Sequence, residues 1–166
     1  MRAQQLIDAL GLQPHPEGGW YREVFRSSDR VSPADGRAPR HALTSIYFLL
    51  EAGQHSRWHR VLSDEVWVHL EGATLALWTC DSALGTAPVC THVGPVDDHG
   101  RRPQHVVRAG EWQAARPLAA DGTSAYSLAA CMVAPGFDFA DFALMPPESA
   151  EAARLAQHGP EFTGLI

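Results

Sequence analysis

Short runs in which apolar and polar residues alternate recur along most of the chain. Each run is rich in β-branched or aromatic residues and is bounded by Gly, Pro, Asp or Ser, which is the pattern of β-strands separated by turns. The predicted strands are residues 20–26, 43–50, 54–61, 65–71, 74–79, 88–93, 104–107, 113–116, 126–133 and 141–144. So many short strands predict an all-β jelly-roll barrel.

A helical period appears only near the two ends of the chain. Residues 3–10 predict a short amphipathic helix that ends at Gly11, and residues 148–157 predict a terminal helix closed by Gly159. Two segments without a strand pattern are predicted as loops, 27–40 and 96–103. The expected protein is therefore a β-barrel with a short helix at each end.

Composition narrows the class of protein. A chain of 166 residues with 45% hydrophobic residues, and with no repeat or linker, predicts a single compact domain over residues 1–166. The net charge is −6 and basic residues are not clustered, which argues against a nucleic-acid partner. No segment is long and apolar enough to predict a membrane partner.

The basic residues and the cysteines restrict the chemistry further. All 13 basic residues are arginine, so Schiff-base and lysine general-base chemistry are not expected. Three cysteines without CxxC spacing, Cys80, Cys90 and Cys131, predict packed thiols in a reducing compartment, and hence a cytoplasmic protein.

Two neighbouring strands carry the most informative polar residues. Along the first, Arg57, His59 and Val61 are predicted to share a face because side chains alternate. A turn follows, and Glu65, Trp67 and His69 are predicted to share a face of the returning strand. If both faces are the inner ones, antiparallel pairing forms a pocket floor of imidazole, carboxylate, guanidinium and indole.

The spacing of Gly53, His59, Glu65 and Gly72 resembles the first motif of the cupin superfamily, with Val61 where the second histidine is expected. Further downstream, Gly110 matches the second motif. Arg108 replaces its proline there, and Gln113 replaces the last histidine ligand.

Longer segments make the resemblance more specific. Residues 15–23, 43–49, 56–60, 112–117 and 134–139 resemble signature segments of one cupin branch, the domain of unknown function 985, or cupin type 5. This branch is grouped with the fold of dTDP-4-dehydrorhamnose 3,5-epimerase. The resemblance covers roughly residues 5–145. It implies a double-stranded β-helix, with the core of the cupin domain at about 12–145, and a homodimer.

The altered motif bears on metal binding. Of the four expected ligands only His59 and Glu65 are present, and a neutral glutamine amide is a poor replacement for histidine. We therefore expect no cofactor. If a divalent transition metal does bind, its ligands are expected to be His59, Glu65 and Gln113.

The candidate site follows from these observations. His59 and Glu65 are the predicted catalytic pair, with His59 as general base and Glu65 orienting it or sharing its proton. The predicted ligand-binding residues are Arg57, Trp67, Gln113, Tyr47, His69, Glu17, Phe137 and Phe139.

Each candidate also has a structural interpretation. The aromatic residues are also compatible with barrel core, which is the commoner place for large apolar groups, Gln113 with a buried amide at a strand edge, and Arg57 with an outer salt bridge. Glu17 and Glu23 lie beside the Gly18-Gly19 turn, where they would close the barrel mouth or pair across a dimer.

Three functions are consistent with these residues. The first is a small-molecule-binding cupin that acts as a metal-independent acid/base enzyme, an isomerase, epimerase or cyclase working on a small polar metabolite. The second is a non-catalytic metabolite-binding protein. The third, which Val61 and Gln113 make the least favoured, is a metal-dependent cupin oxygenase or isomerase.

Overall fold

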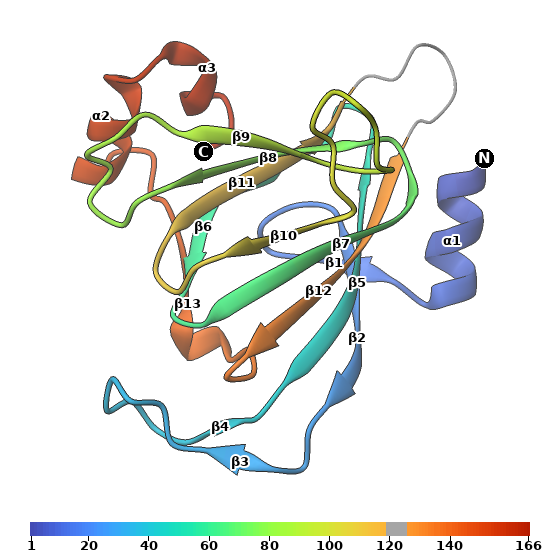
Figure 1. Ribbon diagram of the computed structural model, residues 1–166, viewed down its shortest axis with the longest axis horizontal. Coiled ribbons are helices and arrows are strands. Elements are labelled where there is room, and N and C mark those ends of the chain that lie inside the picture. Colours follow the sequence, from blue (N-terminus) through green and yellow to red (C-terminus); the bar gives the residue numbers. More distant parts are fainter. Residues whose placement is uncertain (119–125) are drawn as a thin grey trace.

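Two antiparallel sheets face each other in the computed structural model, which describes residues 1–118 and 126–166 (Figure 1). The first sheet has the order β1 (Gln13–Pro14), β2 (Trp20–Arg26), β5 (Thr44–Glu51), β12 (Tyr126–Ala134), β7 (Asp64–Gly72) and β10 (Gln104–Val107). The second has the order β13 (Phe142–Leu144), β6 (Ser56–Val61), β11 (Trp112–Pro117), β8 (Leu75–Cys80) and β9 (Val89–Val93). The predicted all-β class is confirmed.

The space between the sheets is filled by alternate residues of the strands. Phe48, Trp67, Leu77 and Cys131 are buried there, each from a different strand. Burial of such large apolar side chains contributes roughly 2 kcal/mol each to folding. Phe48, Trp67 and Cys131 of this core also line the cavity described below.

Helices cover the outer faces of both sheets. α1 (Arg2–Leu10) packs Leu6 and Ile7 against Leu49 and Leu128 of the first sheet. α2 (Ala150–Ala156) and α3 (Pro160–Thr163) pack against the outer face of the second sheet, over the indole of Trp58. The predicted helices near both ends are confirmed. Within the described residues, no helix combines the length and apolar character that a membrane crossing requires.

Several predicted boundaries were wrong. The segment 27–40 is not only a loop, because β3 (Arg30–Val31) pairs with β4 (Arg40–His41) in a two-stranded arm that projects from the barrel at the bottom of Figure 1. Gly159 does not close α2. It is instead the N-cap residue of α3, a helix that the pattern did not predict. Residues 139–141 form a 3₁₀ turn, so the last strand begins only at Phe142.

Candidate functional site

A cavity of about 400 Å³ opens between the two sheets. It is lined by strands β2, β5, β6, β7 and β12, by the β1–β2 hairpin and by the segment that follows β12. Its lining residues are Gln13, His15, Glu17, Tyr21, Glu23, Arg26, Thr44, Ile46, Phe48, His59, Val61, Glu65, Trp67, Cys131, Val133, Phe137, Asp138 and Phe139. Acidic groups and imidazoles thus share the cavity with many aromatic and aliphatic side chains.

Glu65 is held at the floor of this cavity by a buried chain of hydrogen bonds. The Nε1 of Trp67 donates to Oε1 of Gln113 at 2.9 Å, and the Nε2 of Gln113 donates to Oε2 of Glu65 at 2.6 Å. Because Gln113 lies opposite His59 in the β11–β6 pairing, its amide sits directly behind the floor. Glutamine therefore orients the carboxyl group from the place where cupins carry a ligand histidine.

Glu17 reaches the same floor from the hairpin between β1 and β2. Its carbonyl oxygen accepts a hydrogen bond from the N–H of Arg57 at 2.8 Å, which fastens the hairpin to the edge of β6. Gly18 makes this approach possible, since a Cβ there would lie 2.4 Å from the carbonyl oxygen of His55 and the φ angle is +113°. The Oε2 of Glu17 consequently lies 3.2 Å from Nε2 of His59.

The partners of His59 define its tautomer. Nδ1 lies 2.7 Å from the carbonyl oxygen of Arg57, which can only accept, so we assign the ring proton to Nδ1. Nε2 then carries the free lone pair and faces Glu17. The hydroxyl of Ser56 lies 3.4 Å from Nδ1 and supports this orientation.

Burial sets the protonation of the three floor residues. It raises the pKa of Glu17 to about 8 and that of Glu65 to about 7, and it lowers the pKa of His59. The Glu17–His59 contact has the length of a salt bridge, but both shifts favour the uncharged forms. Near neutral pH it is therefore a hydrogen bond from a carboxylic acid to a neutral imidazole.

His15 also belongs to the floor, although the sequence pattern gave it no role. Its Nδ1 accepts a hydrogen bond from the N–H of Glu17 at 3.3 Å and lies 3.5 Å from Oε2 of the same residue. Burial lowers its pKa to about 4, so it is neutral. The Gly18-Gly19 turn was predicted from the sequence, and both glycines have positive φ, but no signal in the sequence shows that this hairpin docks with His15 at the floor.

Aromatic and charged residues surround the mouth of the cavity. The rings of Phe137 and Phe139 meet edge to face, 5.0 Å apart. Arg26 binds Glu23 through two hydrogen bonds of 2.9 and 2.6 Å, and it donates a third to the carbonyl oxygen of Phe137 at 3.3 Å. The segment after β12 is thereby fixed to β2.

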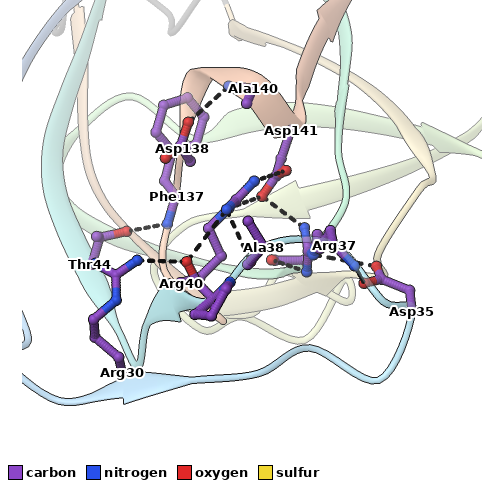
Figure 2. Close-up of polar contacts among 12 residues, drawn as sticks. Arg30, Asp35, Arg37, Ala38, Arg40, Thr44, Phe137, Asp138, Ala140 and Asp141 are labelled. Atoms are coloured by element: carbon purple, nitrogen blue, oxygen red, sulfur yellow. Dashed lines mark hydrogen bonds and ion pairs between the residues drawn. The ribbon is translucent and has the colours of Figure 1, made fainter.

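The arm fixes the same segment from its other side, as Figure 2 shows. Asp141 accepts hydrogen bonds of 2.8 Å from the guanidinium groups of Arg37 and Arg40. The hydroxyl of Thr44 accepts from the N–H of Phe137 at 2.9 Å. The segment 27–40, which was predicted as a loop, thus helps to position the aromatic residues at the mouth of the cavity.

Six of the predicted site residues line the cavity: Glu17, His59, Glu65, Trp67, Phe137 and Phe139. Gln113 lies behind it and makes its contacts with Glu65 and Trp67. The prediction that these residues bind a ligand remains a prediction.

Three other predicted ligand residues lie away from the cavity. Arg57 is exposed and donates to the carbonyl oxygen of Pro16, because one extra residue in β6, opposite Ala114 of β11, forms a bulge that breaks the alternation. Tyr47 lies on the outer face of β5, beneath α1. His69 lies further along β7, with Nε2 3.2 Å from the carbonyl oxygens of Gly72 and Ala73.

The donors present do not fit the metal centre that the cupin motif implies. Val61 contributes only an apolar side chain at the position of the second histidine, and the amide of Gln113 already bonds with Trp67 and Glu65. In the part of the chain that the structure describes, no group of three or more His, Cys, Asp or Glu residues is arranged to hold a metal ion.

The two facing sheets and the cavity between them define a double-stranded β-helix of the cupin kind. Residues 4–145 match the family described as Cupin superfamily (DUF985), and the chain belongs to that family. The resemblance predicted from the sequence is confirmed.

Solved structures agree with this assignment. A hypothetical protein from Leishmania major is 35% identical, with a TM-score of 0.83 over 99% of this chain and 96% of that one. A protein from Shewanella oneidensis is 33% identical, with a TM-score of 0.84 over 98% and 96% of the two chains. A cupin 2 domain-containing protein from Halorhodospira halophila shares the fold at 15% identity, with a TM-score of 0.55 over 93% and 94%. No curated protein matches the chain.

Proposed function

We propose that the cavity binds a small polar organic molecule and that Glu17, His59 and Glu65 act on it by metal-independent acid/base chemistry, as in an isomerase, epimerase or cyclase. One observation carries this proposal. Three titratable side chains from three separate elements meet in one cavity, and the pKa values of both carboxyl groups are raised toward neutral pH. Such perturbed groups in a cleft are typical of acid/base sites.

The geometry gives each residue a role. The free oxygen of the Glu17 carboxyl group accepts a proton from the bound molecule while its hydroxyl passes its own proton to Nε2 of His59, so that His59 is the base that finally holds the proton. Nδ1–H keeps its bond to the carbonyl oxygen of Arg57 and stabilises the imidazolium. Glu65, held by Gln113, donates a proton to a second atom of the same molecule. Between turnovers the imidazolium of His59 loses one proton and Glu65 regains one, which restores the starting protonation of the floor. One proton is taken and one is given, so the substrate is rearranged without a co-reactant.

A non-catalytic binding protein is the alternative. It is favoured by the enclosed cavity, which would hold a ligand whether or not a reaction follows. A cytoplasmic homodimer also remains part of the proposal. The three cysteines support a reducing compartment, since all of them are free thiols in the structure.

The proposal is tested on untagged protein purified without chelator. Native mass spectrometry reports the oligomer and any bound mass, and denaturation releases the ligand for identification. The released compound is then incubated with the protein in D₂O, and ¹H NMR follows deuterium incorporation. We expect a dimer that carries an organic mass, and we expect exchange at a carbon-bound proton.

The variant His59→Asn separates catalysis from binding. Asparagine can still donate to the carbonyl oxygen of Arg57 but supplies no base, so exchange should fall about 100-fold or more while the ligand stays bound. His92→Asn, at an exposed histidine of β9, is the matched control. Retention of the ligand with no exchange in either the wild-type protein or the variant would leave the binding protein as the function. A stoichiometric transition metal would overturn the metal-independent mechanism.

A further inference from the structure

The charges that face the cavity are predominantly acidic. Among the described lining residues, Glu17 and Glu65 lie at the floor and Glu23 and Asp138 at the mouth, whereas Arg26 is the single guanidinium. His15 and His59 add no positive charge, because burial lowers the pKa of both. Whatever the protonation of the floor, this lining has no net positive charge.

Arg26 is also committed to protein partners. Its Nε and Nη2 donate to the two carboxylate oxygens of Glu23, and its Nη1 donates to the carbonyl oxygen of Phe137. An incoming phosphate or carboxylate would meet a guanidinium whose charge Glu23 already offsets, and it would lie among the acidic groups of the lining. Anions are therefore poorly accommodated.

The aromatic side of the mouth has the complementary property. Phe137 and Phe139 stand perpendicular to each other at 5.0 Å, and the ring of His15 is nearly parallel to that of Phe139, at 6.3 Å and 23°. Phe142 packs 6.0 Å from each phenylalanine ring. The faces of aromatic rings attract cations, and clustered rings form the sites that recognise ammonium groups.

We propose that the ligand of this cavity carries an ammonium group, bound between Phe137, Phe139 and the acidic floor, and that phosphorylated and carboxylated molecules are excluded. This inference rests on the proposed function, because it names the substrate class of the same site. The arm contributes to this site, because Arg37 and Arg40 bind Asp141 and thereby hold the segment that carries both phenylalanine rings. A cavity of about 400 Å³ suits a small amine.

Three probes of nearly the same shape test the charge preference. Choline is positive, 3,3-dimethylbutan-1-ol is its neutral isostere, and 3,3-dimethylbutanoate is negative. NMR titration of the wild-type protein should give a dissociation constant for choline about tenfold lower than for the alcohol, since a cation–π contact is worth about 1–2 kcal/mol. The carboxylate should not saturate.

Two variants test the residues that carry the inference. Phe139→Leu should reduce the tenfold preference for choline to about twofold and leave the affinity for the alcohol nearly unchanged. Phe25→Leu, at a half-exposed phenylalanine outside the cavity, is the control and should change neither. Glu23→Gln frees the guanidinium of Arg26 and should introduce measurable binding of the carboxylate.

Each outcome is informative. Equal affinities for choline and the alcohol, tightest binding of the carboxylate, or saturation by none of the three would overturn the inference. The proposed function is judged separately, by the mass released from the native protein and by deuterium exchange. An uncharged or anionic compound that is released and exchanged would overturn the ammonium site but leave the acid/base function standing.

Discussion

Glu17 at the cavity floor and Asp141 beneath the arm have the same exposed fraction, 6%, yet their pKa values move in opposite directions. The pKa of Glu17 is raised to about 8, and that of Asp141 is lowered. Asp141 lies close to the surface and accepts hydrogen bonds from two guanidinium groups. Glu17 lies deep, with imidazoles as its nearest titratable partners. Exposed area alone therefore does not decide whether a carboxyl group is charged.

The two carboxyl groups therefore have different roles in the protein. A carboxylate held by cationic partners is permanently charged and fixes the chain. A carboxyl group without a cationic side chain in contact can gain or lose a proton within the working pH range. The arm is accordingly a structural element and the floor a candidate reactive one.

At a single pH, the largest expected effect is on the arm side of this comparison. Asp141→Asn keeps the volume but removes the anion that Arg37 and Arg40 share, so the free energy of unfolding should fall by about 2 kcal/mol. Asp64→Asn is the control, because Asp64 and Arg108 are exposed and 3.8 Å apart, and its effect should stay within about 0.5 kcal/mol. Urea unfolding at pH 7 measures both. Equal effects would remove the contrast.

The buried Glu17 at the cavity floor should make the stability of the folded protein depend on pH. The folded protein keeps the proton on Glu17 up to a pH of about 8, whereas the ordinary pKa of a glutamate is 4.5, so stability falls as pH rises between these values. Glu17→Gln should make the free energy of unfolding fall less steeply with pH, by up to about 1.4 kcal/mol for each pH unit. Unfolding at pH 5, 6.5 and 8 tests it, with Glu148→Gln, at an exposed residue, as the control. Parallel slopes in both variants would contradict the assignment.

A smaller effect is expected from the residue behind the floor. Gln113→Leu removes the hydrogen bond to Glu65 and leaves the N–H of Trp67 unpaired, which should cost about 1 kcal/mol of stability. The amide also lowers the pKa of Glu65, so its loss should raise that pKa further above 7. Carboxyl ¹³C NMR measures the shift. Gln104→Leu, at an exposed position of β10, should change neither quantity.

The sequence predicted the features that depend on the period of hydrophobic residues and on the spacing of the motif residues. Nine of the eleven described strands in the two facing sheets have four or more residues, long enough for an alternating pattern, and the positions of His59 and Glu65 follow from the motif. The arm strands β3 and β4 have only two residues each and show no period, so that segment was predicted as a loop. Its stability comes from the ion pairs with Asp141, a residue distant in sequence.

The misplaced and missing site residues have equally specific causes. Arg57 was predicted to face inward because strict alternation was assumed, and a bulge is not visible in the pattern of β6. His15 was missed because its position depends on how the β1–β2 hairpin docks, through the contact of Glu17 with Arg57. Tertiary contacts of this kind carry no periodic signal.

The bulge in β6 has a consequence for how this strand can evolve. Strands usually tolerate substitutions but not length changes, because the loss of one residue exchanges inside and outside for everything beyond it. In β6 the bulge already shifts the alternation by one residue. Ser56 and His59, which are three positions apart, therefore lie on the same side and approach each other, whereas Arg57 points outward to the hairpin. Deletion of one residue at the bulge would restore a regular strand but would also move His59 out of the site. Selection should therefore act against deletions at this point of β6.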